Sequence, residues 1–281
     1  MSQAEDLLRQ GQPDAALAAL TEQVRKAPGD SKLRVFLAQL LCVNGAWERA
    51  LAQLKVAAEL DASAIPMQQM IGDAIGCEAV RRDVFAGKRS PMVFGEPEPW
   101  LALLIESLLQ AGNGQHALAQ DLNERALDAA PASSGTLDGN RFEWIADADT
   151  RLGPVLEAVI NGRYYWVPFT RLSEVNTEAP TDLRDLVWLP ARLAFTNGGE
   201  AFALLPVRYP GTELLEDGVV RLSRRTEWKE SQPGRYLGLG QRLLCTDAGE
   251  SGLLEIRNIV LDEASAGEDE GEAVPDAAPE A

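Results

Sequence analysis

Small and large apolar residues recur along the first part of the chain at a spacing of 34 residues. Small residues at a fixed period allow helices to cross closely, and a glycine between two helices supplies the turn. Pro28 ends the first pair of helices, and Asp61 occupies the equivalent region after the second pair. The aligned sets are Ala4, Ala38 and Gly72; Gly11 and Gly45; Ala16 and Ala50; Leu7, Leu41 and Ile75; Leu17 and Leu51; and Leu20 and Leu54. The pattern predicts an N-terminal array of paired helices.

This spacing resembles the tetratricopeptide repeat, in which each unit of 34 residues folds as two helices. Two units cover about 1–62, and a third begins with a helix near 65–86. A fourth pair is expected at 98–111 and 114–130, where the apolar residues again show helical spacing. The stretch GKRSPMVFGEPEP before that pair interrupts the register, so we expect an imperfect array there.

The sequence after the array predicts turns and strands as well as a helix. PASSGTLDGN (131–140) is rich in small, turn-forming residues and predicts a boundary between two domains. A helix is expected at about 148–160, ended by Asn161 and Gly162. RYYWVPF follows, and its density of aromatic residues predicts a strand.

Two pairs of apolar segments predict β-hairpins. DLVWLPARLAFTN and EAFALLPVRY flank the Asn-Gly-Gly sequence at 197–199, whose residues accept the positive φ of a tight turn. QRLLCTD and GLLEIRNIVL form the second pair, and the Tyr-Pro-Gly sequence at 209–211 suits a type II turn. The predicted fold class is α+β: an N-terminal α-solenoid of tetratricopeptide-like helix pairs at 1–130, then an α+β domain with an antiparallel sheet at 141–262.

The formal net charge of −17 is concentrated towards the C-terminal end. Residues 261–281 carry 8 acidic side chains and no basic one, and we expect 263–281 to be a disordered acidic tail. Both folded halves are only mildly acidic, and an acidic chain repels phosphate backbones, so nucleic-acid binding is not expected. No apolar stretch approaches the ~18 residues of a membrane span, and no basic region precedes an apolar run at the N-terminus. A cytoplasmic protein without a membrane partner is therefore expected.

Few residues offer catalytic or metal-binding chemistry. Cys42, Cys77 and Cys245 show no CxxC spacing and are interpreted as reduced thiols, the first two packed on helices. His116, the only histidine, is expected at the surface or at a helix start, and no nucleophile elbow accompanies it. GLGQR (238–242) lacks the lysine of a phosphate-binding loop and is interpreted as a turn. The sequence predicts no catalytic residue, no metal site and no cofactor.

Carboxylate chemistry provides the alternative to this prediction, because it needs no histidine. A cleft pairing Asp185 with Arg208 could bind a small ligand or act as an acid–base pair, so that the helices would only recruit an enzyme or ligand-binding domain. The other interpretation is that these charges tie strand ends together while Trp166, Trp188 and Trp228 fill the core.

Tetratricopeptide arrays present a concave face lined by the first helix of each unit, and a peptide or helix of another protein can occupy that face. The alternative interpretation is that Val35 is simply packed and the polar side chains there are merely solvated. A clamp for extended C-terminal peptides would need basic residues on two sides, and Lys32 and Arg34 are the obvious candidates. The candidate partner-binding residues are Lys32, Val35, Gln39, Gln69 and Asp73.

Five sequence blocks follow one another in the second half: GRYYWVPF, LRDLVWLPARL, LLPVRYPGT, RTEWKE and GLGQR. In this order they resemble the ImpE/TagJ accessory family of bacterial type VI secretion systems, and the helical-repeat front half agrees with the organisation of that family. The family-motif residues, expected to be structural, are Tyr165, Trp166, Pro168, Asp185, Trp188, Pro190, Arg208, Tyr209, Pro210, Gly211, Trp228, Gly240 and Arg242.

The resemblance implies a non-catalytic accessory protein whose partner is the small subunit of the contractile sheath. In that family the contact is thought to involve a helix near the N-terminus of the sheath subunit. The resemblance further implies an influence on sheath assembly, or on sheath disassembly by the associated AAA+ ATPase. The helical groove and the C-terminal sheet are both available to such a partner.

Overall fold

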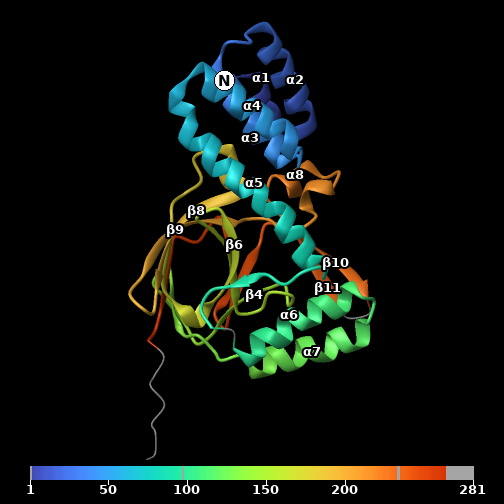
Figure 1. The fold of residues 1–281 in the computed structure, drawn as a ribbon, viewed down its shortest axis with the longest axis vertical. Helices are drawn as coiled ribbons and strands as arrows, with labels where there is room; N and C mark the ends of the chain where they lie inside the picture. Colours follow the sequence, from blue (N-terminus) through green and yellow to red (C-terminus); the bar gives the residue numbers. More distant parts are fainter. Residues whose placement is uncertain (1, 97, 233–234, 264–281) are drawn as a thin grey trace, which may run out of the picture.

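The computed structural model describes residues 2–96, 98–232 and 235–263. An array of helix pairs forms one end of the molecule, and α5 leads from this array along the sheet towards the α6–α7 pair (Figure 1). Apart from Glu263, the tail predicted at 263–281 lies outside the described residues. The helices are α1 Gln3–Arg9, α2 Pro13–Lys26, α3 Ser31–Val43, α4 Trp47–Leu60, α5 Ile65–Phe85, α6 Pro99–Gly112, α7 His116–Ala129 and α8 Gly218–Arg221. Short 3-10 turns are η1 Ala62–Ala64, η2 Phe169–Arg171, η3 Leu183–Leu186 and η4 Thr212–Leu214.

Local sequence signals explain where the first helices begin and end. Pro13 occupies the first turn of α2, where its missing N–H would have no helical partner. Asp30 caps α3 by accepting a hydrogen bond from the Leu33 amide at 3.1 Å. Gly11 and Gly45 have φ angles of +75° and +67° in the turns that follow α1 and α3, a conformation that favours glycine. The 34-residue pattern therefore agrees with the observed pairing of α1 with α2 and of α3 with α4.

Over the described residues, nine strands form one curved sheet in the order β1-β6-β5-β9-β8-β7-β14-β2-β3 (Figure 1). The ribbon β10–β11 and the sheet β13-β12-β4 are separate from it. Pairing is antiparallel except between the two-residue β1 and β6. The predicted fold class is confirmed. The strands are β1 Met92–Val93, β2 Gly135–Leu137, β3 Asn140–Phe142, β4 Ile145–Asp147, β5 Val155–Ile160, β6 Arg163–Pro168, β7 Leu172–Thr177, β8 Trp188–Phe195, β9 Glu200–Pro206, β10 Thr226–Gln232, β11 Arg235–Gly240, β12 Leu243–Thr246, β13 Gly249–Gly252 and β14 Asn258–Leu261.

The helix predicted at about 148–160 is wrong. The first half of this segment forms turns and bends, and the second half is β5, which lies between β6 and β9. All six residues of β5 are buried, because its side chains alternate between the sheet core, as Leu156 does, and a helix-facing cluster, as Val155 does. A strand buried on both faces has no polar alternation to distinguish it from a helix. Asn161 and Gly162, with φ angles of +51° and +71°, form the tight turn into β6.

One predicted hairpin is confirmed and the other is half wrong. β8 pairs with β9 around the predicted turn at 197–199. The type II turn is also present: Pro210 precedes Gly211, whose φ and ψ are +87° and −3°, and the Thr212 amide donates to the Tyr209 carbonyl at 3.3 Å. In the second hairpin, however, β12 pairs with β13, whereas β14 continues into the large sheet between β7 and β2.

The buried apolar side chains form three clusters, and two of these join helices to strands. One cluster lies within the sheets and extends from β3 to β14. The second packs α1–α5 against Val187, Trp188 and Leu222. The third packs α5, α6 and α7 against β5 and β6, with Trp166 fully buried. The helical array and the sheet are therefore held together by shared packing, and the segment 131–140 itself contains β2.

Candidate partner-binding site

Three hollows adjoin one another along one side of the molecule, from the array to the sheet. Their volumes are about 470 Å³ over α3, about 460 Å³ between β7 and β8, and about 390 Å³ between α5 and β9. Thr181 lines the first two hollows, and Phe202 lines the second and third. We refer to the three together as the trough. It is lined by Lys32, Val35, Phe36, Gln39 and Met67 at the array end, by Thr181, Arg184 and Asp185 in the middle, and by Met70, Asp73, Pro190, Phe202 and Leu204 at the sheet end.

The structure brings together most of the groove residues predicted from the sequence. Lys32, Val35 and Gln39 line the array end of the trough from successive turns of one face of α3. Asp73 lines the sheet end instead, and Gln69 is exposed on α5 but lines none of the three hollows. The predicted concave face is thus continued onto the sheet, which the repeat pattern alone does not indicate.

The middle of the trough is shaped by η3, a turn from the second half of the chain that packs against α3. The Asp185 carboxylate accepts hydrogen bonds from the amides of Thr181 and Asp182, both at 2.9 Å, and so fixes the turn. Leu183 and Leu186 pack on the helical cluster below. The η3 turn therefore lies between the array end and the sheet end of the trough.

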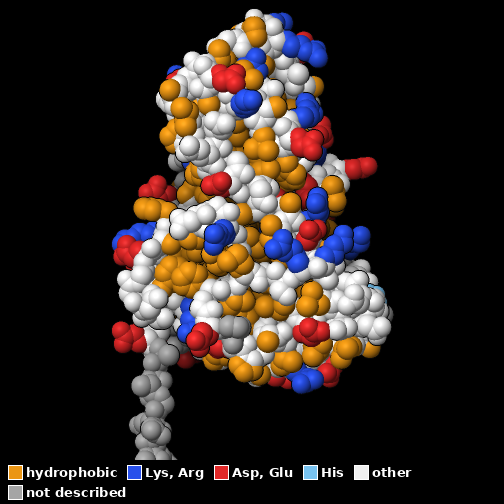
Figure 2. Space-filling model, in the orientation of Figure 1, with side chains coloured by type: hydrophobic (Ala, Val, Ile, Leu, Met, Phe, Trp, Pro, Cys, Tyr) orange, Lys and Arg blue, Asp and Glu red, His pale blue; other side chains and the backbone are white. Residues whose placement is uncertain are grey.

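Phe202 is the most exposed large apolar side chain at the sheet end of the trough. It lies on β9 opposite Arg192 of β8, and 85% of its surface is accessible. Pro190 and Met70 line the hollows beside it. Hydrophobic side chains gather on the body of the molecule below α5 (Figure 2). A contiguous exposed apolar patch is typical of a surface that binds another protein.

The acid–base pair predicted from Asp185 and Arg208 is not formed. Asp185 holds the η3 turn, whereas Arg208 is buried behind it and donates hydrogen bonds from Nη1 to the carbonyls of Val43 at 2.7 Å and Arg221 at 3.0 Å. Arg208 thus joins the end of α3 to the end of α8. The arrangement fits the interpretation that these charges tie elements together.

A cluster of four buried charges lies between α5 and the strands, and we refer to it as the ionic cluster. Arg81 of α5 places Nε 2.6 Å from Glu157 Oε1 on β5. Arg242 places Nε 2.8 Å from Asp147 Oδ2 and Nη1 3.2 Å from Glu157 Oε2. Tyr209 donates its hydroxyl to Asp147 at 2.9 Å. The cluster joins one long helix to three separate stretches of the strand-rich half.

Burial and neighbouring charge act in opposite directions on the two carboxyl groups of the ionic cluster. Burial raises the pKa of Asp147 to about 6, although Arg242 lies beside it. Burial acts in the same direction on Glu157, but the charges of Arg81 and Arg242 outweigh it and hold the pKa of Glu157 below its usual value. Arg81, Asp147 and Glu157 were not identified from the sequence. The available signal was an acid within the apolar run VLEAVI.

The motif tryptophans do not share one environment. Trp166 and Trp188 are fully buried, and Trp188 donates its ring N–H to Glu78 at 2.8 Å. Trp228 remains 40% exposed on β10, with its ring centroid 5.8 Å from that of Tyr209. The prediction that Trp228 fills the core is therefore wrong, because the residue lies on the two-stranded ribbon β10–β11, outside the large sheet.

The remaining motif residues described here lie in strands or at strand ends. Tyr165 and Pro168 lie in β6. Gly240 ends β11 with a φ of +87°, and a Cβ atom there would lie 2.0 Å from the carbonyl oxygen of Arg225. The GLGQR block is thus a strand end followed by buried Arg242, and its interpretation as a turn is wrong.

Residues with metal or thiol chemistry give no further site in the described part of the chain. Cys42 and Cys77 are buried on α3 and α5, as predicted, and burial raises the pKa of their thiols to about 12 and about 11. His116 is exposed at the start of α7. Within residues 2–96, 98–232 and 235–263, no group of acidic, cysteine or histidine side chains is arranged to hold a metal ion. None of the helices described there has the length and hydropathy of a membrane span.

Comparison with known proteins connects this architecture to a family. A family model described as the ImpE protein matches residues 139–260, and a tetratricopeptide-repeat model matches 7–72. The type VI secretion system accessory component TagJ of Pseudomonas aeruginosa is 53% identical over 256 residues, which are 91% of this chain and 90% of that protein. The chain belongs to the ImpE/TagJ family. The resemblance drawn from the five sequence blocks is confirmed, and with it an accessory role in type VI secretion.

A solved structure shows the same architecture as this chain. The crystal structure of a Vibrio parahaemolyticus protein matches with a TM-score of 0.85 at 25% identity, over 94% of this chain and 99% of that one. The tetratricopeptide match lies in α1–α5, and the ImpE match runs from the strand β3 to the strand β14.

Proposed function

We propose that this ImpE/TagJ protein is a non-catalytic adaptor that binds a helix of the contractile-sheath small subunit along the trough. The helix would come from near the N-terminus of that subunit, and its capture would influence sheath assembly or disassembly by the AAA+ ATPase. The observation that carries the proposal is a trough that begins on the tetratricopeptide-like array and ends at the exposed Phe202. The relative named as a type VI accessory component supports the choice of system.

The trough offers the contacts that an amphipathic helix needs. A helix docks through apolar side chains at positions i, i+3 or i+4, and i+7, which reach separate hollows along a groove. Val35 and Phe36 contribute apolar surface at the array end, and Phe202 does so at the sheet end. Met67 and Met70, both on α5, add flexible side chains that adapt to an incoming surface.

The charges around the trough indicate the kind of helix that fits. Six acidic residues line it, namely Glu5, Asp61, Asp73, Glu178, Asp182 and Asp185, against the three basic residues Lys32, Arg184 and Arg192. An excess of acidic side chains favours a partner with basic side chains beside its apolar face. A basic, amphipathic segment of the sheath subunit is therefore the expected ligand.

The absence of catalysis is part of this proposal, and the arrangement of the charged groups supports it. In the described residues, Asp185 and Arg208 do not meet, and the carboxyl groups of the ionic cluster face arginines. An acid or base whose oxygen atoms already contact other protein groups in this way is not placed to exchange a proton with a substrate. The proposal therefore assigns these groups to holding the array on the sheet.

Isothermal titration calorimetry with a peptide of the sheath subunit's N-terminal helix tests the proposal. We expect Phe202→Ala to weaken binding by about tenfold or more, because truncating an exposed aromatic anchor removes most of its contact. Leu118→Ala is the matched control, since Leu118 is also exposed but lies on α7, away from the trough. Folded protein that gives no heat, or equal binding by the Phe202 variant, would count against the proposal.

A further inference from the structure

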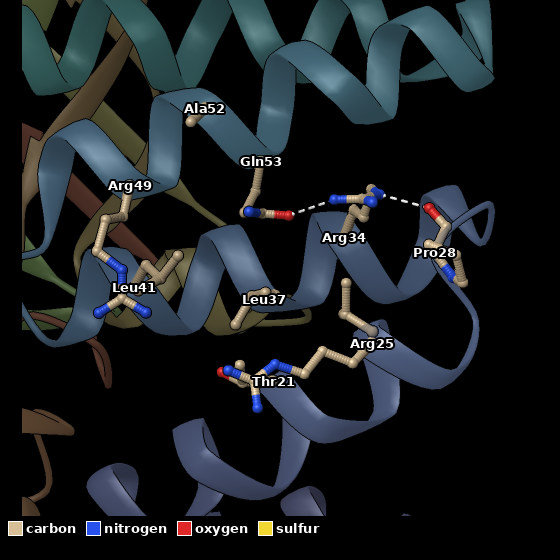
Figure 3. Close-up of a pocket in the computed structure, with 10 residues that line it drawn as sticks. Thr21, Arg25, Pro28, Arg34, Leu37, Leu41, Arg49, Ala52 and Gln53 are labelled. Atoms are coloured by element: carbon tan, nitrogen blue, oxygen red, sulfur yellow. Dashed lines mark hydrogen bonds between the residues drawn. The ribbon is translucent and has the colours of Figure 1, made fainter.

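A second groove lies within the helical array, between α2 and α4 and over α3 (Figure 3). Its volume is about 390 Å³, and we refer to it as the slot. Leu37 and Leu41 of α3 and Val24 of α2 supply apolar lining. A groove between two helices with an apolar floor is a surface on which an added helix can dock. None of the slot residues belongs to the trough.

The slot is basic in a protein that is otherwise acidic. Arg25, Arg34 and Arg49 line it, one from each of its three helices, and no acidic residue lines it. In the whole chain, by contrast, 43 acidic residues outnumber 26 basic ones. Such a local reversal of sign selects an anionic ligand.

The arginines of the slot differ in how firmly they are held. Arg34 donates from Nε to the Pro28 carbonyl and from Nη1 to Gln53 Oε1, both at 2.8 Å, so its guanidinium is fixed across the slot (Figure 3). Arg25 is exposed and pairs with Glu22 at 2.5 Å, and Arg49 is exposed on α4. One fixed and two exposed guanidinium groups can therefore meet carboxylates on both sides of a bound helix.

We propose that the slot binds an acidic amphipathic helix of another polypeptide, with apolar side chains on the Val24, Leu37 and Leu41 floor and carboxylates on the three arginines. The apolar floor favours such a helix over a free phosphate or a nucleic acid, whose charge would lie against hydrocarbon. This site goes beyond the proposed function, which uses the trough and a basic helix.

The protein's own acidic tail is a poorer occupant. Residues 264–281 have acidic side chains but only one large apolar residue, Val274, and they contain Gly267, Gly271, Pro275 and Pro279. A segment of this composition cannot present two large apolar side chains on successive helical turns. Charge alone would draw it to the slot, so it serves as the control for amphipathicity.

The test uses the full chain and a designed 18-residue helical peptide with leucines on one face and glutamates beside them. We expect this peptide to bind, and the double variant Arg25→Glu/Arg49→Glu to weaken binding by about tenfold or more. Both arginines are exposed, so the fold should be unaffected, which circular dichroism checks. A matched control is Arg125→Glu/Lys88→Glu, which changes the charge equally at exposed positions outside the slot.

Three further probes complete the test. A version of the peptide with lysine in place of glutamate, and a peptide of residues 262–281, should each bind at least about tenfold more weakly than the acidic helix. Phe202→Ala should leave the slot affinity unchanged, which separates this site from the trough. No binding of the acidic helix, equal binding by the slot variant, or equal binding of the lysine or tail peptide would overturn the proposal.

Discussion

At the residue scale, the ionic cluster shows how charge is used inside this protein. Glu157 has no exposed surface, yet it faces Arg81 and Arg242 and accepts a hydrogen bond from the Tyr164 hydroxyl at 2.5 Å. Removing two charges from water has a large free-energy cost, which is offset only when their partners are well placed. Removing one partner should therefore lower the free energy of unfolding by far more than the intact ion pair contributes to it.

The first prediction concerns Glu157→Gln, which keeps the side-chain shape but removes the charge. We expect its free energy of unfolding to fall by about 3 to 5 kcal/mol, because Arg81 and Arg242 would lose their shared counter-charge. Urea denaturation measures the change. Asp121→Asn serves as the control, because Asp121 forms an exposed ion pair with Arg125 on α7 and should have no measurable effect. Similar behaviour of the two variants would show that the cluster is unimportant for stability.

The second prediction concerns the pH dependence of stability. Burial raises the pKa of Asp147 to about 6 in the folded protein, above its value in the unfolded chain. Because the folded state binds this proton more tightly than the unfolded chain, protonation of Asp147 stabilises the fold. This stabilisation is complete below the pKa of the unfolded chain and is lost as the pH rises through about 6. The contribution is on the order of 3 kcal/mol. The difference in unfolding free energy between wild type and Asp147→Asn should therefore vary from pH 4 to 6.5, and parallel profiles would contradict the assignment.

At the element scale, the turns and caps are encoded locally, while the burial of strands and the position of η3 are not. Asn161 and Gly162 are predicted from residue type to end the element before them, and they form the turn into β6. The Asp30 cap is also local, because it accepts a hydrogen bond from an amide only three residues away. The sequence of β5 predicts a helix because both faces of the strand are buried, and only the folded arrangement reveals the layer on each side. The packing of η3 on α3 joins residues about 150 positions apart, which no local pattern encodes.

The candidate site was predictable only in part for the same reason. Lys32, Val35 and Gln39 follow from the repeat, because residues on one helical face line one groove. Phe202 carries no such signal, since an aromatic residue within a strand normally packs into the core. Phe202 is exposed because its side chain lies on the face of β9 that points away from the core.

The third prediction concerns the end of β11. Gly240→Ala should lower the free energy of unfolding by about 2 kcal/mol or more, because its φ of +87° disfavours any side chain and a Cβ atom would overlap the Arg225 carbonyl oxygen. Thermal or urea unfolding measures this. Gly29→Ala is the control, because that glycine has no atom within 4 Å of an added Cβ and no positive φ. A neutral Gly240 variant would mean that the end of β11 can move away from the Arg225 carbonyl at no cost in stability.

At the scale of the whole molecule, the array and the sheet should unfold as one unit, since shared clusters and the Trp188 to Glu78 hydrogen bond join them. The fourth prediction is therefore that helicity and tryptophan fluorescence report the same urea midpoint. Trp188→Ala should lower stability by about 3 to 5 kcal/mol, because it removes a fully buried ring. Loss of helicity in wild type well before the fluorescence change would show that the array folds independently.

The shared packing gives the molecule one rigid surface on which two grooves of opposite charge are displayed. Acidic residues outnumber basic ones around the trough, whereas the charged residues that line the slot are all arginines, so we expect each groove to select a different helix. Under the proposed function, each groove would hold its partner by shape and charge.

The most direct test of the account is to locate the sheath peptide on the protein. A photo-crosslinking amino acid placed at position 202 in the trough, at position 52 in the slot, or at position 118 on α7 would report contact at each place. The account predicts that the peptide of the sheath small subunit's N-terminal helix crosslinks strongly from position 202 and not from position 118. Crosslinking from position 52 or 118 alone, with none from position 202, would contradict it.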